Sequence, residues 1–387
     1  MAIGPQPARK EAQNLMLPRE RLLRSLNRQP TDRAPMDLAG TSVTGITAGA
    51  YERLKKRLGV QSETRVCHRM MQLVRVDEAV LQRLGIDTRS VEMRGPKTWR
   101  DIEFPDGSYQ DEWGVVRARP KSSHYYDLVK SPLAGENVTL EHVAAFKWPD
   151  PDAQSRCVGV AAEAAALRKT GYAICTSLHA GFITNSQYMR GFQDWFMDVA
   201  ANQDLLVAIL RKNLDIRLEI IGPYLAALGD NVDVVMVGDD LATQQGPMFS
   251  LAAYRDLMKP LQKQLFAFIR RRTRAKIMYH CCGSVYPFLP DLADLDIDII
   301  NPVQVTAANM DTERLKAEWG GRFAFWGGID THRVLPLGSP ADVKAEVKRR
   351  LADLGPSGYV LNAVHNLQPD VPPENIVAMY EQVTGDR

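Results

Sequence analysis

The sequence contains no long apolar run and almost no excess of one charge. No stretch of 18 or more apolar residues occurs in its 387 residues, so we expect no transmembrane helix. The opening stretch MAIGPQPARKEAQNLMLPRE has no apolar segment of signal-peptide length. Lysine and arginine number 48 and acidic residues 46, a formal net charge of +2. This balance gives no reason to expect nucleic acid, a membrane surface or a polyanion as a partner.

Cysteine is scarce, and the five residues form an odd set with two adjacent members: Cys67, Cys157, Cys175, Cys281 and Cys282. Such a set does not suit the disulfide framework of a secreted protein, and it favours reduced thiols in a cytoplasm. A chain of this length buries a large core without disulfides or structural metals. At 45% hydrophobic and 24% charged residues, the composition is that of an ordinary globular protein. We therefore expect a cytoplasmic enzyme.

Short β-rich apolar runs alternate with amphipathic helical stretches along the C-terminal two-thirds. Each run is apolar on both faces, as the strands of a buried parallel sheet must be. The predicted strands are 171–178, 232–238, 275–280, 297–301, 322–328 and 358–364, with two more at 34–39 and 86–93. Eight strands of this kind predict a (β/α)₈ barrel. The alternative is a doubly wound open sheet, for which the sequence offers no Gly-rich phosphate loop.

Capping signals delimit the helices between these strands. A helix is predicted over 340–354, where Ser339 is the candidate N-cap and Gly355 follows the end. Another runs from Ser250 into the arginines at 270–272, and a kink or break is expected near Pro260.

The segment 100–130 interrupts the alternation of strands and helices. Its sequence FPDGSYQDEWGVV predicts a β-hairpin with a turn at Asp106-Gly107. We interpret it as an antiparallel insertion near the mouth of the barrel. The whole chain, 1–387, is then one barrel domain, with an N-terminal extension and helix over 1–30.

Polar residues follow the predicted strands at their carboxyl ends, where the active site of such a barrel lies. His280 and Cys282 are two residues apart on one extended segment, so their side chains can converge while Cys281 points elsewhere. His365 arrives from another strand end. Two imidazoles and a thiolate make a plausible three-ligand zinc site with one open position, as in catalytic zinc centres. The alternative is that both cysteines are buried small hydrophobic residues.

Further motifs resemble the uroporphyrinogen decarboxylase superfamily. KIMYHCCGSVYPFLPDLADLDIDIINPVQ is similar to the family segment H-x-C-G … D-(I/V)-(I/L)-N-P-V-Q. Supporting matches are LPRERLLRSLNRQPTDRAPMDLAG, GDDLATQQGPMFSLAAYRDLMKP, FAFWGGIDTHRVLPLGSPADVKAEV and HNLQPDVPPENIVAMY. They occur in order over most of the chain. The resemblance is to the branch of cobalamin-dependent methyltransferases, and it implies a (β/α)₈ barrel.

Two departures from the family patterns bear on function. Uroporphyrinogen decarboxylases carry an R-Q-A-G-R segment after the first strand that holds substrate carboxylates, whereas this chain reads DLAGTS from Asp37 and has no arginine there. The methyltransferase branch binds zinc through H-x-C and a later cysteine, and His365 stands where that cysteine would be. Imidazole suits zinc, and the exchange removes one negative charge, which makes the zinc a stronger Lewis acid.

The resemblance therefore implies methyl transfer from a small methoxylated, or thio- or amine-methylated, compound to a corrinoid. Zinc held by His280, Cys282 and His365 would bind the leaving heteroatom, and Asp239 or Asp240 would supply a proton or orient the substrate. The residues expected to contact the substrate or to line its pocket are Asp37, His179, Gln245, Tyr279, Asn301, Gln304 and Trp326. No D-x-H-x-x-G corrinoid signature occurs, so a separate corrinoid protein is expected to dock over the barrel mouth. A homodimer is a further expectation.

Three alternatives remain at this stage. The first is a metal-independent decarboxylase of a tetrapyrrole or another carboxylic acid, with Asp37 as its key residue. The second is a non-catalytic protein that binds a metabolite in the same pocket. The third is a transferase that places a thiol in the zinc shell. The acceptor of the methyl group also stays open between a corrinoid, a folate and a thiol.

Overall fold

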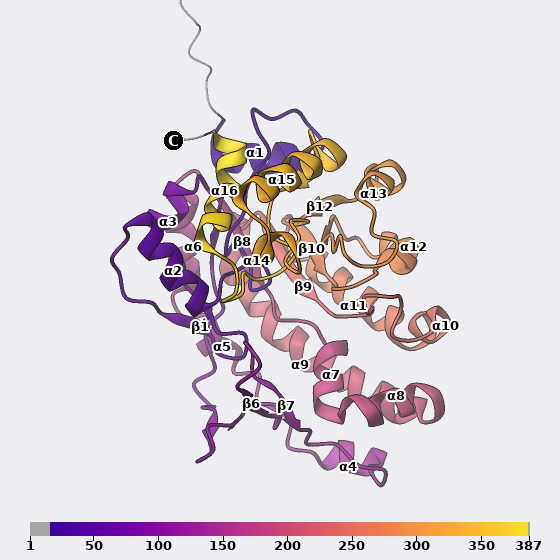
Figure 1. Cartoon of the computed structure of the whole chain (residues 1–387). Helices are drawn as coiled ribbons and strands as arrows, with labels where there is room; N and C mark the ends of the chain where they lie inside the picture. The colour runs from indigo at the N-terminus through magenta and orange to yellow at the C-terminus, as the bar shows by residue number, and fades with distance from the viewer. Residues whose placement is uncertain (1–15, 386–387) are drawn as a thin grey trace, which may run out of the picture.

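A parallel sheet that curls into a barrel forms the centre of the computed structural model, which describes residues 16–385 (Figure 1). In spatial order its strands are β3 (Thr88–Ser90), β8 (Ala173–Ser177), β9 (Val234–Gly238), β10 (Lys276–His280), β11 (Ile299–Asn301), β12 (Ala324–Trp326) and β13 (Tyr359–Val360). Met36 closes the ring. It forms a parallel bridge with Leu361 beyond β13, and its carbonyl accepts a hydrogen bond from the Asp87 N–H beside β3, at 2.9 Å. The predicted (β/α)₈ barrel is confirmed.

Two apolar layers lie on the two faces of the sheet, because alternate side chains of a strand point to opposite sides. Inside the barrel, Met236, Met278 and Ile299 pack with Leu22 and Leu26 of α1 (Pro18–Leu26), which closes the amino-terminal end. Outside, the intervening residues of the same strands pack against the surrounding helices. Inward positions near the carboxyl ends of the strands are thus left for the site.

The helices that cover the sheet begin and end where capping residues allow. They include α2 (Ala48–Leu58), α3 (Glu78–Arg83), α6 (Val160–Arg168), α9 (Gln203–Leu228), α11 (Lys259–Arg270), α12 (Leu289–Ala293), α13 (Thr312–Trp319), α14 (Val334–Leu337), α15 (Pro340–Leu354) and α16 (Pro373–Thr384). The predicted helix 340–354 is α15, and the Ser339 hydroxyl caps it by accepting from the Asp342 N–H at 3.3 Å. The break expected near Pro260 is a π-helical turn, Tyr254–Met258, between α10 (Leu251–Ala253) and α11.

The insertion is larger than the predicted hairpin. It is a four-stranded antiparallel sheet of β4 (Ile102–Glu103), β5 (Tyr109–Gln110), β6 (Val116–Ala118) and β7 (Asp127–Lys130). The turn at Asp106-Gly107 joins β4 to β5, as predicted. Tyr125, between β6 and β7, accepts a hydrogen bond from Gln368 Nε2 beyond β13, at 2.6 Å. The insertion therefore lies over the carboxyl ends of the strands, opposite to α1 (Figure 1).

Shorter elements connect these parts. They are β1 (Val66–His68), β2 (Leu73–Val74), α4 (Leu140–Ala145), α5 (Ala153–Arg156), α7 (Ile183–Arg190) and α8 (Phe192–Ala201). Of the N-terminal extension expected over 1–30, residues 1–15 lie outside the described residues and the helix is α1. From residue 16 to residue 385, every helix is too short or too polar to span a bilayer.

Candidate functional site

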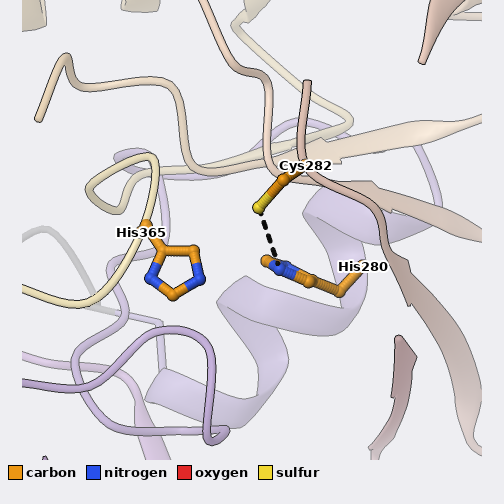
Figure 2. A group of neighbouring side chains, drawn as sticks. All are labelled: His280, Cys282 and His365. Carbon is orange, nitrogen blue, oxygen red and sulfur yellow. Dashed lines mark hydrogen bonds between the residues drawn. The ribbon is translucent and has the colours of Figure 1, made fainter. Parts of the chain in front are cut away.

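His280, Cys282 and His365 converge at the carboxyl ends of β10 and β13 (Figure 2). Their candidate ligand atoms all lie within 4.8 Å of one another. The Cys282 Sγ is 3.4 Å from His280 Nε2, and the ring centroids of His280 and His365 are 5.3 Å apart. His280 is buried, whereas the other two are partly exposed. The spacing of H-x-C on a strand end and the second histidine thus produce one compact cluster.

The turn after His280 is fixed by close backbone contacts. Gly283 has φ +85°, and a Cβ built on it would lie 2.4 Å from the Thr243 carbonyl oxygen, so only glycine fits. The Gly283 N–H donates to Gln304 Oε1 at 2.7 Å. Cys281 turns to the outside, where its Sγ accepts from the Leu241 N–H at 3.3 Å. Cys282 is left facing His280.

A hydrogen bond to Asn301 orients His280. Its Nδ1 lies 2.6 Å from Asn301 Oδ1, and the amide nitrogen of Asn301 donates to the Trp326 carbonyl at 3.1 Å. Asn301 therefore presents its oxygen, and the proton of neutral His280 sits on Nδ1. Burial lowers the pKa of His280 and favours that neutral form. Its Nε2 lone pair points at Cys282, which is the form a metal ligand requires.

His365 is held in the opposite tautomer. The Asn366 N–H donates to His365 Nδ1 at 2.8 Å, so the proton of the neutral ring sits on Nε2. In Figure 2 that nitrogen lies on the side of His280. Burial and the nearby His280 lower the pKa of His365 to about 3, so the ring is neutral. Binding a metal through Nε2 would require this proton to leave and the Asn366 N–H to lose its acceptor.

The chemistry of the three donors fits zinc. Imidazole nitrogen and thiolate sulfur are both ligand types that zinc binds, and three protein ligands leave a fourth position open. Burial, with the Asp240 carboxylate nearby, raises the pKa of the Cys282 thiol far above its usual range, so the thiol stays protonated without a cation beside it. A divalent cation would reverse that preference, and its binding would release protons. His280 and Cys282 already face each other as ligands of such a cation would. His365 could bind the same cation only after a change of tautomer.

Two adjacent aspartates follow β9 beside the cluster. Asp240 Oδ1 accepts from the Cys282 N–H at 2.9 Å and so fixes the backbone of that residue. Asp239 is buried, and its Oδ1 accepts from the Thr184 N–H at 2.8 Å. Burial, with the charge of Asp240 added, raises the pKa of Asp239 to about 7. A carboxyl group that exchanges its proton near neutral pH is suited to general acid–base chemistry.

Two residues predicted to contact substrate lie inside the barrel and have no exposed surface. Asp37 accepts from the Gly40 N–H at 2.9 Å, from Trp326 Nε1 at 3.0 Å and from the Thr88 hydroxyl. Its relative exposure and that of Trp326 are both 0%. Burial raises the pKa of Asp37. These side chains form a floor beneath Asn301, and the structure does not bring them to the mouth.

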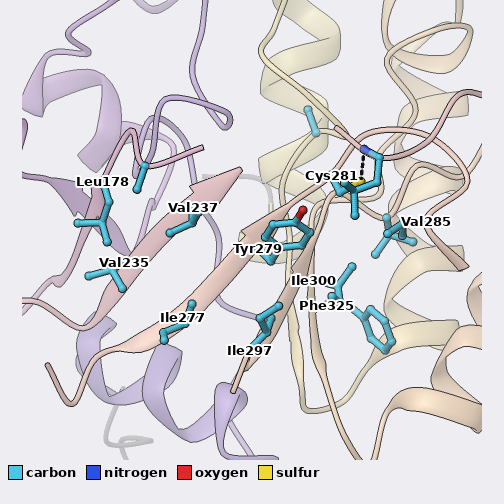
Figure 3. Packing of buried hydrophobic residues seen from close by; sticks show 14 of the residues in the cluster. Leu178, Val235, Val237, Ile277, Tyr279, Cys281, Val285, Ile297, Ile300 and Phe325 are labelled. Atoms are coloured by element: carbon cyan, nitrogen blue, oxygen red, sulfur yellow. Dashed lines mark hydrogen bonds between the residues drawn. The ribbon is translucent and has the colours of Figure 1, made fainter. Parts of the chain in front are cut away.

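Tyr279 points away from the site, which corrects its expected place as a wall. It lies on the outer face of β10, in the apolar layer shown in Figure 3. Its hydroxyl accepts from Gln262 Nε2 at 2.9 Å and donates to the Asp239 carbonyl at 3.2 Å. Because His280 faces inward, its neighbour on the strand must face outward. Gln245 is exposed on the loop after β9, and Asn301 and Gln304 support the ligand candidates.

His179 lines a cavity of about 80 Å³ together with His68 and Glu92. The centroids of the two rings are 6.1 Å apart. Surrounding protein lowers the pKa of His179, with smaller contributions from His68 and Arg217. One contact links this cavity to the segment that carries His365: Asn366 Nδ2 donates at 3.2 Å to the carbonyl of Ser42, which lines the cavity.

Two buried tyrosines were not among the predicted site residues. Tyr125 comes from the insertion, where its hydroxyl contacts Asn366 and Gln368, and Tyr188 comes from α7. Burial raises the pKa of both phenols. Neither follows a predicted strand, so inspection of the strand ends could not find them.

Comparison with known proteins agrees with this architecture. A family model described as uroporphyrinogen decarboxylase (URO-D) matches residues 126–385, about two-thirds of the chain and all three candidate ligands. The chain belongs to the uroporphyrinogen decarboxylase family. The membership predicted from its motifs is confirmed.

Two curated proteins are similar to this chain in sequence, and one solved structure is similar to it in fold. Uroporphyrinogen decarboxylase of Pelodictyon phaeoclathratiforme is 28% identical over 137 residues, and that of Chlorobaculum tepidum 26% over 134. Each match covers 34% of this chain and 36% of the relative, about a third of its length. A methyltransferase from Methanosarcina mazei has a TM-score of 0.65 at 17% identity, over 95% of this chain and 98% of that one. It has the same fold.

Proposed function

We propose that this family member is a zinc-dependent methyltransferase. It moves a methyl group from a small methoxylated, or thio- or amine-methylated, compound to a corrinoid on a separate protein. The observation that carries the proposal is the convergence of His280, Cys282 and His365 within 4.8 Å at the mouth of the barrel. A decarboxylase that needs no metal has no use for such a cluster.

The side chains of the site would divide the work between holding zinc and orienting its ligands. His280, Cys282 and His365 would hold the ion, which, when bound, supplies a Lewis acid for the heteroatom that loses its methyl group. Asn301 keeps the Nε2 lone pair of His280 free, and Gln304 fixes the turn that carries Cys282. These supports matter because ligand orientation sets metal affinity.

Asp239 would supply the proton that the demethylated heteroatom needs. Its pKa of about 7 keeps a large fraction protonated at neutral pH. Asp240 keeps Cys282 in position through the backbone. The methyl donor would lie between the candidate metal ligands and His179, and the corrinoid protein would dock over the insertion side of the mouth. Asp37 and Trp326 support the floor of the site.

Decarboxylation is the second candidate, because the curated relatives are uroporphyrinogen decarboxylases. One observation weighs against it: the Asp37 carboxylate is occupied by internal hydrogen bonds.

Metal content decides between the two candidates. Wild-type protein purified without added metal is compared with Cys282→Ala and with the matched control Cys281→Ala, whose thiol points out of the site. We expect near one zinc per chain in the wild type and the control, and loss of zinc in Cys282→Ala. The loaded protein should then demethylate a methoxylated compound in the presence of cob(I)alamin. A wild type that binds no zinc when zinc is offered would put decarboxylation first.

A further inference from the structure

Arg217 of α9 is a cation that lies against the insertion and has no direct partner among the described residues. Between residues 16 and 385 it forms no ion pair and no hydrogen bond, and its Nε is shut off from solvent without a partner. Its guanidinium lies over the ring of Trp113 in the insertion, with Cζ 4.4 Å from the ring centroid. This stacking fixes the plane of the group while leaving its N–H donors unused.

The acidic residues near Arg217 are already engaged. Glu112 pairs with Arg156, which also donates to a backbone carbonyl. Asp111 accepts from the Trp113 and Val115 N–H groups at 3.0 Å each and pairs with Arg117 at 3.5 Å. Both carboxylates of the insertion therefore pair with other arginines, and neither pairs with Arg217.

The charge of Arg217 reaches the candidate site. It contributes to the low pKa of His179 on the cavity wall, and the carboxylate of Asp239 acts on Arg217 in turn. A second arginine, Arg117, is stacked in the same way, with Cζ 4.3 Å from the ring centroid of Tyr188. Burial lowers the pKa of Arg217 to about 10, so the guanidinium stays charged at neutral pH.

A partly buried, stacked guanidinium with free donors is a receptor for a planar anion, because two parallel N–H groups match the two oxygens of a carboxylate. One such guanidinium matches one carboxylate, whereas the several carboxylates of a tetrapyrrole would need several cations. We propose that Arg217 binds a carboxylate of the methyl donor. The donor is then a small methylated compound with a carboxylate at the end remote from the methyl group. The assignment to a methyl donor rests on the proposed function; carboxylate binding does not.

Matched acids and amides test this inference. The probes are methoxyacetate against methoxyacetamide and 3-methoxybenzoate against 3-methoxybenzamide, with affinity measured by calorimetry and by the fluorescence of Trp113. We expect the wild type to bind each acid at least tenfold more tightly than its amide, Arg217→Gln to lose this preference and Arg217→Lys to retain part of it. Arg272→Gln is the control, since Arg272 is also stacked on an aromatic ring, Phe268, but is exposed and elsewhere.

The same titration in Cys282→Ala separates this inference from the proposed function. An acid preference that survives in Cys282→Ala, when that variant has lost zinc, supports carboxylate binding whatever the reaction is. Equal affinity for acid and amide in the wild type, or no binding of any acid, overturns the inference. The inference is also overturned if Arg217→Gln still binds each acid more tightly than its amide. Circular dichroism of both Arg217 variants confirms that they are folded.

Discussion

His280 and His365 differ in the hydrogen bond at Nδ1, and this difference decides what each ring presents to the site. The Asn301 oxygen draws the proton of His280 to Nδ1 and leaves Nε2 bare. The Asn366 N–H leaves the proton of His365 on Nε2. Of the three ligand candidates, His365 is therefore the one whose contribution to a metal site costs a rearrangement.

Asp239 gives the site a pH dependence whose sign follows from its burial. The pKa rises from 3.8 to about 7 on folding, so the folded protein binds a proton that the unfolded chain has lost between these values. Stability therefore falls as pH rises from about 4 to about 7, with a slope of up to ~1.4 kcal/mol per pH unit from this group. Asp239→Asn keeps the acceptor for the Thr184 N–H and removes the titration.

We therefore expect Asp239→Asn to gain stability relative to wild type at pH 8, by about 2–4 kcal/mol, and to be close to wild type at pH 4. Urea unfolding at several pH values measures this difference. The proposed methyl transfer should decline above pH 7, as Asp239 loses its proton. A pH-independent difference between the two proteins would contradict the assigned pKa shift.

At the scale of elements, the turn from β10 to Gly283 carries the site. Gly283→Ala places a Cβ against the Thr243 carbonyl at a positive φ. We expect backbone strain to lower the unfolding free energy by about 2–4 kcal/mol. The content of the proposed zinc should also fall, because Cys282 moves with the turn. Gly246→Ala in the loop after β9 is the control, since a Cβ there meets nothing within 4 Å. Thermal unfolding and zinc per chain are the measurements, and a Gly283→Ala variant as stable and as zinc-rich as the control would contradict this account.

The same element shows what the sequence could predict. Apolar runs located the strands, and alternation along β10 predicted that His280 and Cys282 share a face. That alternation also excludes Tyr279 from the site. The second half of the insertion was missed because VRARPKSSHYYDLVK lacks regular alternation and is held by contacts with distant residues, such as that of Tyr125 with Gln368. Arg217 was missed for a related reason: it lies within a helix, and only the insertion makes it part of the mouth.

At the scale of the whole molecule, the barrel is closed at its amino-terminal end by one buried carboxylate. Asp87 accepts from Arg21 at 2.5 Å, from Arg33 at 2.7 Å and from the Met36 N–H at 2.8 Å, and so joins α1, the bridge segment at Met36 and the start of β3. Asp87 is fully buried and Arg21 nearly so. Removing this charge leaves Arg21 and Arg33 without their carboxylate while they are partly or fully shielded from water. This lowers the unfolding free energy far more than the loss of an exposed ion pair does.

We expect Asp87→Asn to lose about 3–5 kcal/mol of unfolding free energy, whereas Asp256→Asn, at an exposed position, should change it by less than about 0.5 kcal/mol. Chemical denaturation measures both. The site lies at the opposite end of the barrel, so the folded fraction of Asp87→Asn should bind the proposed zinc and the proposed carboxylate as well as the wild type does. Loss of zinc from chains that remain folded would show that closure of the barrel also sets the distance between His365, which follows β13, and His280 on β10, and that the two ends of the molecule are coupled.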